Sequence, residues 1–109
     1  MDSNREPTIK EEKLLSVLVK RSSIAIPENW RDGLLVRSMD DGKMGSLLLF
    51  PQNTLNEDRV FGEQVSDFQF IDLDGVQVIA SLYLDNRGNL FELDIWKTNF
   101  EELLEFPDL

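Results

Sequence analysis

Residues 75–97 read GVQVIASLYLDNRGNLFELDIWK, and this stretch decides the fold. Its first part, residues 76–84, is rich in valine, isoleucine, leucine and tyrosine, which suit a pleated surface. Residues 85–88, DNRG, interrupt the apolar run, and Gly88 can supply the left-handed conformation that a three-residue hairpin loop needs. Residues 90–97 then return as a second strand. The stretch therefore predicts a long β-hairpin.

The pairing of the two strands predicts which side chains share a face. If Asp85 pairs with Asn89, alternation along each strand defines a core face and an opposite face. The expected core face holds mainly apolar and aromatic side chains: Ile79, Ser81, Tyr83, Phe91, Leu93 and Ile95. The opposite face is mixed: Val78, Ala80, Leu82, Leu84, Leu90, Glu92, Asp94 and Trp96. Because a slip of one residue would bury Glu92 and Asp94, we expect a firmly set register.

The chain before the hairpin predicts one helix and three strands. Thr8 followed three residues later by Glu11 is a capping-box pattern, and a leucine stripe follows it, so we expect a helix over residues 9–21. Strands are expected over residues 34–39, 44–50 and 65–71, separated by polar turns. Residues 1–7 are polar and are expected to be flexible.

The end of the chain predicts a second, short helix. Asn99 can cap it with Glu102 three residues on, and Pro107 would stop it. Its apolar side chains are expected to dock on the sheet: Phe100, Leu103, Leu104 and Phe106. The expected fold is thus a single α+β domain over residues 1–109. It has a five-stranded antiparallel meander, an N-terminal helix on one face and a short C-terminal helix.

Composition excludes several classes of chemistry. The 109 residues contain no cysteine and no histidine, so a disulfide framework, zinc chemistry and nucleophiles activated by histidine are not expected. No apolar run is long enough to span a membrane. We therefore expect a cytoplasmic protein that uses no cofactor.

The charge is uneven along the chain. The net charge is −10, and residues 1–33 contribute none of it, because their six acids balance six bases. Residues 34–109 carry fifteen acids and five bases, which gives the full −10. Such a surface disfavours nucleic-acid binding, which needs a basic footprint. It suits a protein partner with a basic surface, although acidity can also serve solubility alone.

Two pairs of carboxylates have a spacing that could suit a metal ion. Glu92 and Asp94 lie two apart on one strand face, about 7 Å from each other, and such a pair can bind a divalent cation or share a proton. Asp72 and Asp74 resemble half of a calcium loop, but the distal glutamate of an EF-hand is missing. The glycine-rich residues 42–46 lack the spacing of a phosphate-binding loop.

Four phrases carry a resemblance to a known family: MGSL at residues 44–47, RVFG at 59–62, DLDGV at 72–76 and GNLFELDIWK at 88–97. In these phrases the chain resembles a small bacterial family of uncharacterised single-domain proteins, over most of its length after Trp30. The resemblance implies no activity and no catalytic residue. In size, acidity and α+β build the chain is also similar to immunity proteins of bacterial toxin systems.

These observations favour a non-enzymatic acidic binding protein, most concretely an immunity-type inhibitor of a basic bacterial toxin such as a nuclease. The expected partner surface is acidic with one aromatic anchor: Asp40, Asp41, Asp72, Asp74, Glu92, Asp94 and Trp96. Two alternatives stay open. One is a small metal-dependent enzyme or metal-binding protein that uses Glu92 and Asp94, and the other is a housekeeping protein-interaction module.

Overall fold

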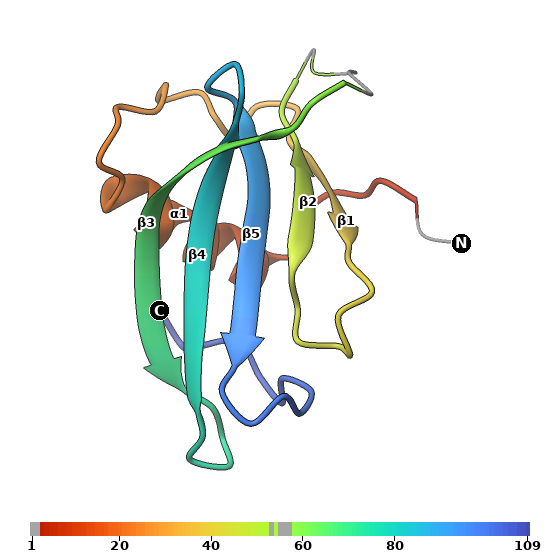
Figure 1. Cartoon of the computed structure of the whole chain (residues 1–109), viewed down its shortest axis with the longest axis vertical. Helices are drawn as coiled ribbons and strands as arrows, with labels where there is room; N and C mark the ends of the chain where they lie inside the picture. Colours follow the sequence, from red (N-terminus) through yellow and green to blue (C-terminus); the bar gives the residue numbers. More distant parts are fainter. Residues whose placement is uncertain (1–2, 53, 55–57) are drawn as a thin grey trace.

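The computed structural model describes residues 3–52, 54 and 58–109. In these residues one helix packs on one face of a five-stranded antiparallel sheet (Figure 1). The helix is α1 (Ile9–Lys20). The strands are β1 (Leu35–Ser38), β2 (Leu47–Phe50), β3 (Phe61–Ile71), β4 (Gln77–Asp85) and β5 (Leu90–Lys97). The α+β class and the five strands are therefore confirmed.

The strand order is β1-β2-β5-β4-β3, so the expected meander is only partly correct. β3, β4 and β5 follow one another, and β1 and β2 form a hairpin, but β2 pairs with β5 rather than with β3. The chain that enters β3 crosses over the ends of β5 and β4 to reach the far edge (Figure 1). Gly62 lies at this crossing, where a Cβ atom would overlap the carbonyl oxygen of Asp85. Only glycine therefore allows this approach.

The predicted capping box begins α1. The hydroxyl of Thr8 accepts the N–H of Glu11 at 3.1 Å, and the carboxylate of Glu11 accepts the N–H of Thr8 at 2.8 Å. Leu14, Leu15 and Leu18 are fully buried and join the core of the sheet. The expected helix is confirmed. In the part of the chain that the structure describes, no helix is long and apolar enough to cross a membrane.

The first residues are tied to the edge of the sheet. Arg5 and Val36 exchange two backbone hydrogen bonds of 2.9 and 2.7 Å, which extends the β1 edge. The guanidinium of Arg5 also binds both carboxylate oxygens of Glu11, at 2.8 and 3.0 Å. Thus Arg5, within the segment that the sequence predicted to be flexible, is held by both its backbone and its side chain.

The register of the central hairpin differs from the predicted one. Asp85 does donate to the carbonyl of Asn89, but Phe91 is an extra residue between the pairs Leu84–Leu90 and Tyr83–Glu92. The bulge places Phe91 against the ring of Phe61, with centroids 5.1 Å apart.

Because of this bulge, the two strands differ in how well their core faces were predicted. Leu93 and Ile95 are buried, and Lys43 is exposed, as expected. On β4 the assignment is wrong, since the residues in the core are Val78, Ala80, Leu82 and Leu84. The side chains placed there by the prediction, Ile79, Ser81 and Tyr83, lie on the opposite face. Leu90 at the start of β5, expected on that opposite face, is buried in the core.

The predicted C-terminal helix is absent from residues 98–109, all of which are described. Phe100 adopts a left-handed conformation with φ of 64°, which does not suit a helix. The N–H groups of Leu104 and Glu105 donate to the carboxylate of Asp72 instead of to an earlier turn. Leu103 and Phe106 dock on the core, whereas Phe100 and Leu104 are exposed.

Candidate functional site

The face of the sheet opposite α1, here called the outer face, carries the candidate site. Trp96 stands on it with 41% of its surface exposed, and its ring lies 6.0 Å from that of Phe100, which is 71% exposed. Across the strand pair Trp96 lies opposite Ile79, and Asp94 lies opposite Ser81. The outer face therefore combines exposed aromatic surface with carboxylates, which is the composition of an anchor with a charged rim.

A groove of about 500 Å³ lies on the outer face, and Asp94 is the residue that it shares with the surface just described. Tyr83, Glu92 and Asp94 line it from the two central strands, Phe61 to Gln64 from the crossing chain, and Met39 from the end of the first hairpin.

Glu92 is the least exposed acid in the groove, at 7% of its surface, and its carboxylate accepts no hydrogen bond from any described residue. Burial raises the pKa of Glu92, and the nearby carboxylate of Asp94 raises it further. Burial also raises the pKa of the Tyr83 hydroxyl, with Asp94 and Glu92 adding to the shift. The Glu92 oxygens are only partly desolvated, since Ser66 Oγ is the single buried side-chain N or O atom without a hydrogen-bond partner among the described residues. A carboxylate in such a position attracts a positively charged group.

Asp94 is held at the junction between β2 and β5. The hydroxyl of Ser46 accepts the N–H of Ile95 at 2.8 Å and lies 3.4 Å from one carboxylate oxygen of Asp94. Ser46 is itself buried. This contact positions Asp94 without neutralising it.

The predicted acids Asp72 and Asp74 belong to a different cluster. Lys97 is fully buried, and its ammonium lies 2.8 Å from Asp72 and 2.7 Å from Asp74. Burial would lower the pKa of Lys97, but the two carboxylates outweigh this effect and raise it. Asp72 is buried and its oxygens are used internally, so it is not available to a partner. Both acids therefore lie outside the outer-face site.

The acids Asp40 and Asp41 lie in the turn between β1 and β2. Asp40 is exposed. The two carboxylate oxygens of Asp41 accept the N–H groups of Met44 and Ser46, at 3.1 and 3.0 Å, so Asp41 shapes the turn. Of the seven predicted site residues, the structure brings Glu92, Asp94 and Trp96 together on one face.

Sequence reasoning missed Tyr83, Phe61 and Met39 as neighbours of the acids. Regular alternation along the strands places Tyr83 on the core face, because it takes no account of the bulge at Phe91. Phe61 and Met39 come from distant segments, and nothing local to Glu92 points to them. Knowledge of the β4–β5 register would have found Tyr83, since it lies directly opposite Glu92.

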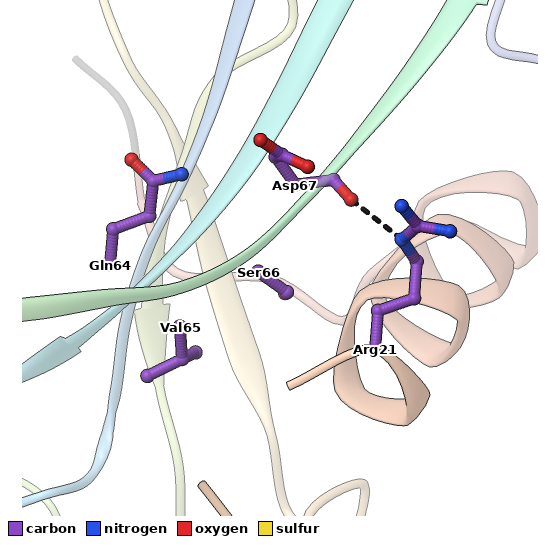
Figure 2. Close-up of a pocket in the computed structure, with 5 residues that line it drawn as sticks. All are labelled: Arg21, Gln64, Val65, Ser66 and Asp67. Atoms are coloured by element: carbon purple, nitrogen blue, oxygen red, sulfur yellow. Dashed lines mark hydrogen bonds between the residues drawn. The ribbon is translucent and has the colours of Figure 1, made fainter. Parts of the chain in front are cut away.

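A second hollow lies where the end of α1 meets β3 (Figure 2). Arg21 donates to the main-chain oxygen of Asp67 at 2.7 Å, and the Asp67 carboxylate points away from it. The N–H of Ser23 likewise donates to the carbonyl of Val65 at 2.9 Å. These bonds occupy backbone acceptors of an edge strand, so this hollow is explained by protection of the sheet edge.

The described residues contain no group of three or more histidine, cysteine, aspartate or glutamate side chains arranged to hold a metal ion. Glu92 and Asp94 alone supply two carboxylates. Calcium takes six to eight oxygen ligands, so a cation bound here would depend largely on water.

Comparison with known proteins identifies the family. The sequence pattern of a domain of unknown function (DUF6984) matches residues 4–107. The chain belongs to the DUF6984 family. No curated protein and no solved structure matched it. Membership of an uncharacterised family was expected, whereas none of these comparisons bears on the likeness to immunity proteins.

Three of the phrases that carried the resemblance supply residues that hold the DUF6984 fold together. Arg59 is buried, binds the carboxylate of Asp85 at 2.9 Å and donates to two backbone carbonyls. Burial would raise the pKa of Asp85, but backbone N–H groups and Arg59 outweigh this and lower it. Asp72, Asp74 and Lys97 form the second such cluster. In these two clusters the phrases contribute to the structure, whereas Glu92, Asp94 and Trp96 of the last phrase lie on the outer face.

Proposed function

We propose that this DUF6984 protein is a non-enzymatic binding protein whose outer face docks a partner with a basic surface. The observation that carries the proposal is the exposed Trp96 and Phe100 beside the unneutralised carboxylates of Glu92 and Asp94. Aromatic anchors with a charged rim are typical of protein interfaces. The net charge of −10 would accelerate encounter with a positively charged partner.

The most concrete form of this proposal is an immunity-type inhibitor of a basic bacterial toxin, such as a nuclease, in the cytoplasm. A nuclease binds phosphates with lysines and arginines, and an acidic face can occupy the same groups. The support is physical complementarity and the absence of histidine and cysteine, which removes common catalytic and metal-binding groups. A housekeeping interaction module would use the same face with another partner.

Association kinetics with the product of the neighbouring gene test this proposal. Association should slow as salt rises, because screening shortens the reach of charges to about 8 Å at physiological ionic strength. The double substitution Glu92→Gln with Asp94→Asn should lower the association rate and leave the fold intact.

The matched control is Glu28→Gln with Asp32→Asn. It changes the net charge equally, at two exposed acids in the loop between α1 and β1. An association rate that ignores salt and responds equally to the two double substitutions would remove the acidic face from the mechanism. A neighbouring gene that encodes no toxin would favour the housekeeping alternative.

A further inference from the structure

We propose that the outer-face groove lined by Tyr83, Glu92 and Asp94 receives an arginine side chain of the protein partner, with its guanidinium between Glu92 and Asp94 and against the ring of Tyr83. This inference rests on the proposed function and adds the chemical group that the outer face recognises. It concerns a position in the groove at which no described residue supplies a cation.

Glu92 provides the first argument. The side chain of Glu92 is largely buried, but its carboxylate oxygens reach the groove and are only partly desolvated. A partly desolvated carboxylate without a hydrogen-bond partner is favourably placed to bind an incoming donor. Glu92 is 7% exposed, lines the groove and receives no donor from any described residue. The same desolvation raises the pKa of its carboxyl group. An incoming cation with several N–H donors would satisfy it.

The spacing of the acids favours arginine over lysine. Glu92 and Asp94 lie on the same strand face about 7 Å apart, so a planar guanidinium with five N–H donors can reach toward both carboxylates. A lysine ammonium is a compact charge that can face only one of them closely. Tyr83 lies directly opposite Glu92, and its ring offers a stacking surface.

The protein already holds one of its own arginines in this way. The guanidinium of Arg59 lies 5.6 Å from the ring centre of Phe50 and 5.1 Å from that of Phe91, and it binds the Asp85 carboxylate at 2.9 Å. The groove repeats this combination with Tyr83 and Phe61, whose rings meet edge to face at 5.2 Å, and with Glu92. In the groove, the place of the guanidinium is taken by no described residue.

The probe for this inference is the Nα-acetyl amide of arginine, titrated into the full chain and followed by amide NMR. The corresponding amides of lysine and norleucine are the comparison probes. We expect saturable shifts around Tyr83, Glu92 and Asp94 with a dissociation constant in the millimolar range. Glu92→Gln should weaken arginine binding about tenfold, because it removes a charge-assisted pair.

Glu12→Gln is the matched control, since Glu12 lies on α1, which packs on the face of the sheet opposite the groove, and its side chain is 45% exposed. It should leave arginine binding within about twofold of the original, because a distant exposed charge is largely screened. Glu92→Gln should unfold at the same or a higher temperature, because the raised pKa means that folding disfavours the ionised carboxylate. Loss of binding in this variant would therefore not reflect loss of the fold.

Three results would overturn the inference: no saturable shift in the groove, equal binding of the lysine and arginine probes, or equal effects of Glu92→Gln and Glu12→Gln. These failures differ from failure of the proposed function. If the probe fails while partner association remains fast and salt-dependent, only the arginine site is wrong. If the probe binds but no partner association depends on the outer face, the proposed function is wrong.

Discussion

Asp72→Asn should release the C-terminal residues from the sheet. One oxygen of the Asp72 carboxylate accepts the N–H of Leu104 and binds the ammonium of Lys97, both at 2.8 Å. The other oxygen accepts the N–H groups of Leu73 and Glu105, at 2.8 and 3.1 Å. All four partners are donors, so both terminal atoms of the side chain at position 72 must be hydrogen-bond acceptors.

The expected cost follows from this geometry. An asparagine keeps one acceptor and turns the other oxygen into an amino group, which then faces two donors in either orientation. A hydrogen bond to a charged group contributes about 1.5–3 kcal/mol, and an unsatisfied buried group costs about 1–3 kcal/mol. We therefore expect Asp72→Asn to lower the free energy of unfolding by about 3–5 kcal/mol, the range for breaking a buried ion pair. That is a large part of the total stability of a small domain, about 5–15 kcal/mol.

Urea denaturation followed by tryptophan fluorescence measures this change, because Trp96 lies next to Lys97 in the chain. Asp74→Asn is the control, since Asp74 binds the same ammonium at 2.7 Å but its side chain is 36% exposed. It should cost clearly less than Asp72→Asn. If the two variants lose the same stability, or if Asp72→Asn costs less than about 0.5 kcal/mol as at surface sites, Asp72 does not organise the C-terminal residues.

The same carboxylate predicts a dependence on pH. Burial would raise the pKa of Asp72, but the N–H of Leu104, the Lys97 ammonium and two further N–H groups outweigh it and hold the pKa at about 2, below 3.8. A lowered pKa in the folded state contributes stability above the unfolded pKa and loses it as pH falls through the folded value. The difference in stability between the original protein and Asp72→Asn should therefore be full at neutral pH and shrink between about pH 4 and 2.

Leu93→Ala should cost about 2–5 kcal/mol in urea denaturation, because the Leu93 side chain is fully buried in the core. The exposed Leu73→Ala is its control, and a loss below about 0.5 kcal/mol at Leu93 would contradict the assigned core face. Calorimetry with calcium, magnesium and manganese should show at most weak binding, since Glu92 and Asp94 supply only two carboxylates. A sub-micromolar site that disappears in Glu92→Gln would instead support the metal-binding alternative.

The sequence determined the features that depend on near neighbours in the chain. The start of α1 was predictable because Thr8 and Glu11 satisfy each other's backbone groups within one turn. The turn at Gly88 was predictable because glycine readily adopts the left-handed conformation that the loop needs, and its φ is 83°. The common face of Glu92, Asp94 and Trp96 follows from alternation along a single strand, whatever strand lies beside it.

The tertiary structure decided everything that depends on which strands and segments meet. Because of the bulge at Phe91, the β4 side chains in the core are the ones that regular alternation places on the opposite face. At the bulge Phe91 packs against Phe61, which is thirty residues earlier in the chain. The capping residues and apolar spacing at the end of the chain predict a helix, yet the N–H groups of Leu104 and Glu105 donate to the carboxylate of Asp72 instead. At such positions the conformation depends on the balance between the local preference of the chain and the hydrogen bonds and burial that distant residues provide. Because the distant contacts are worth more than helix or turn propensities, only the folded structure shows that Tyr83 faces Glu92.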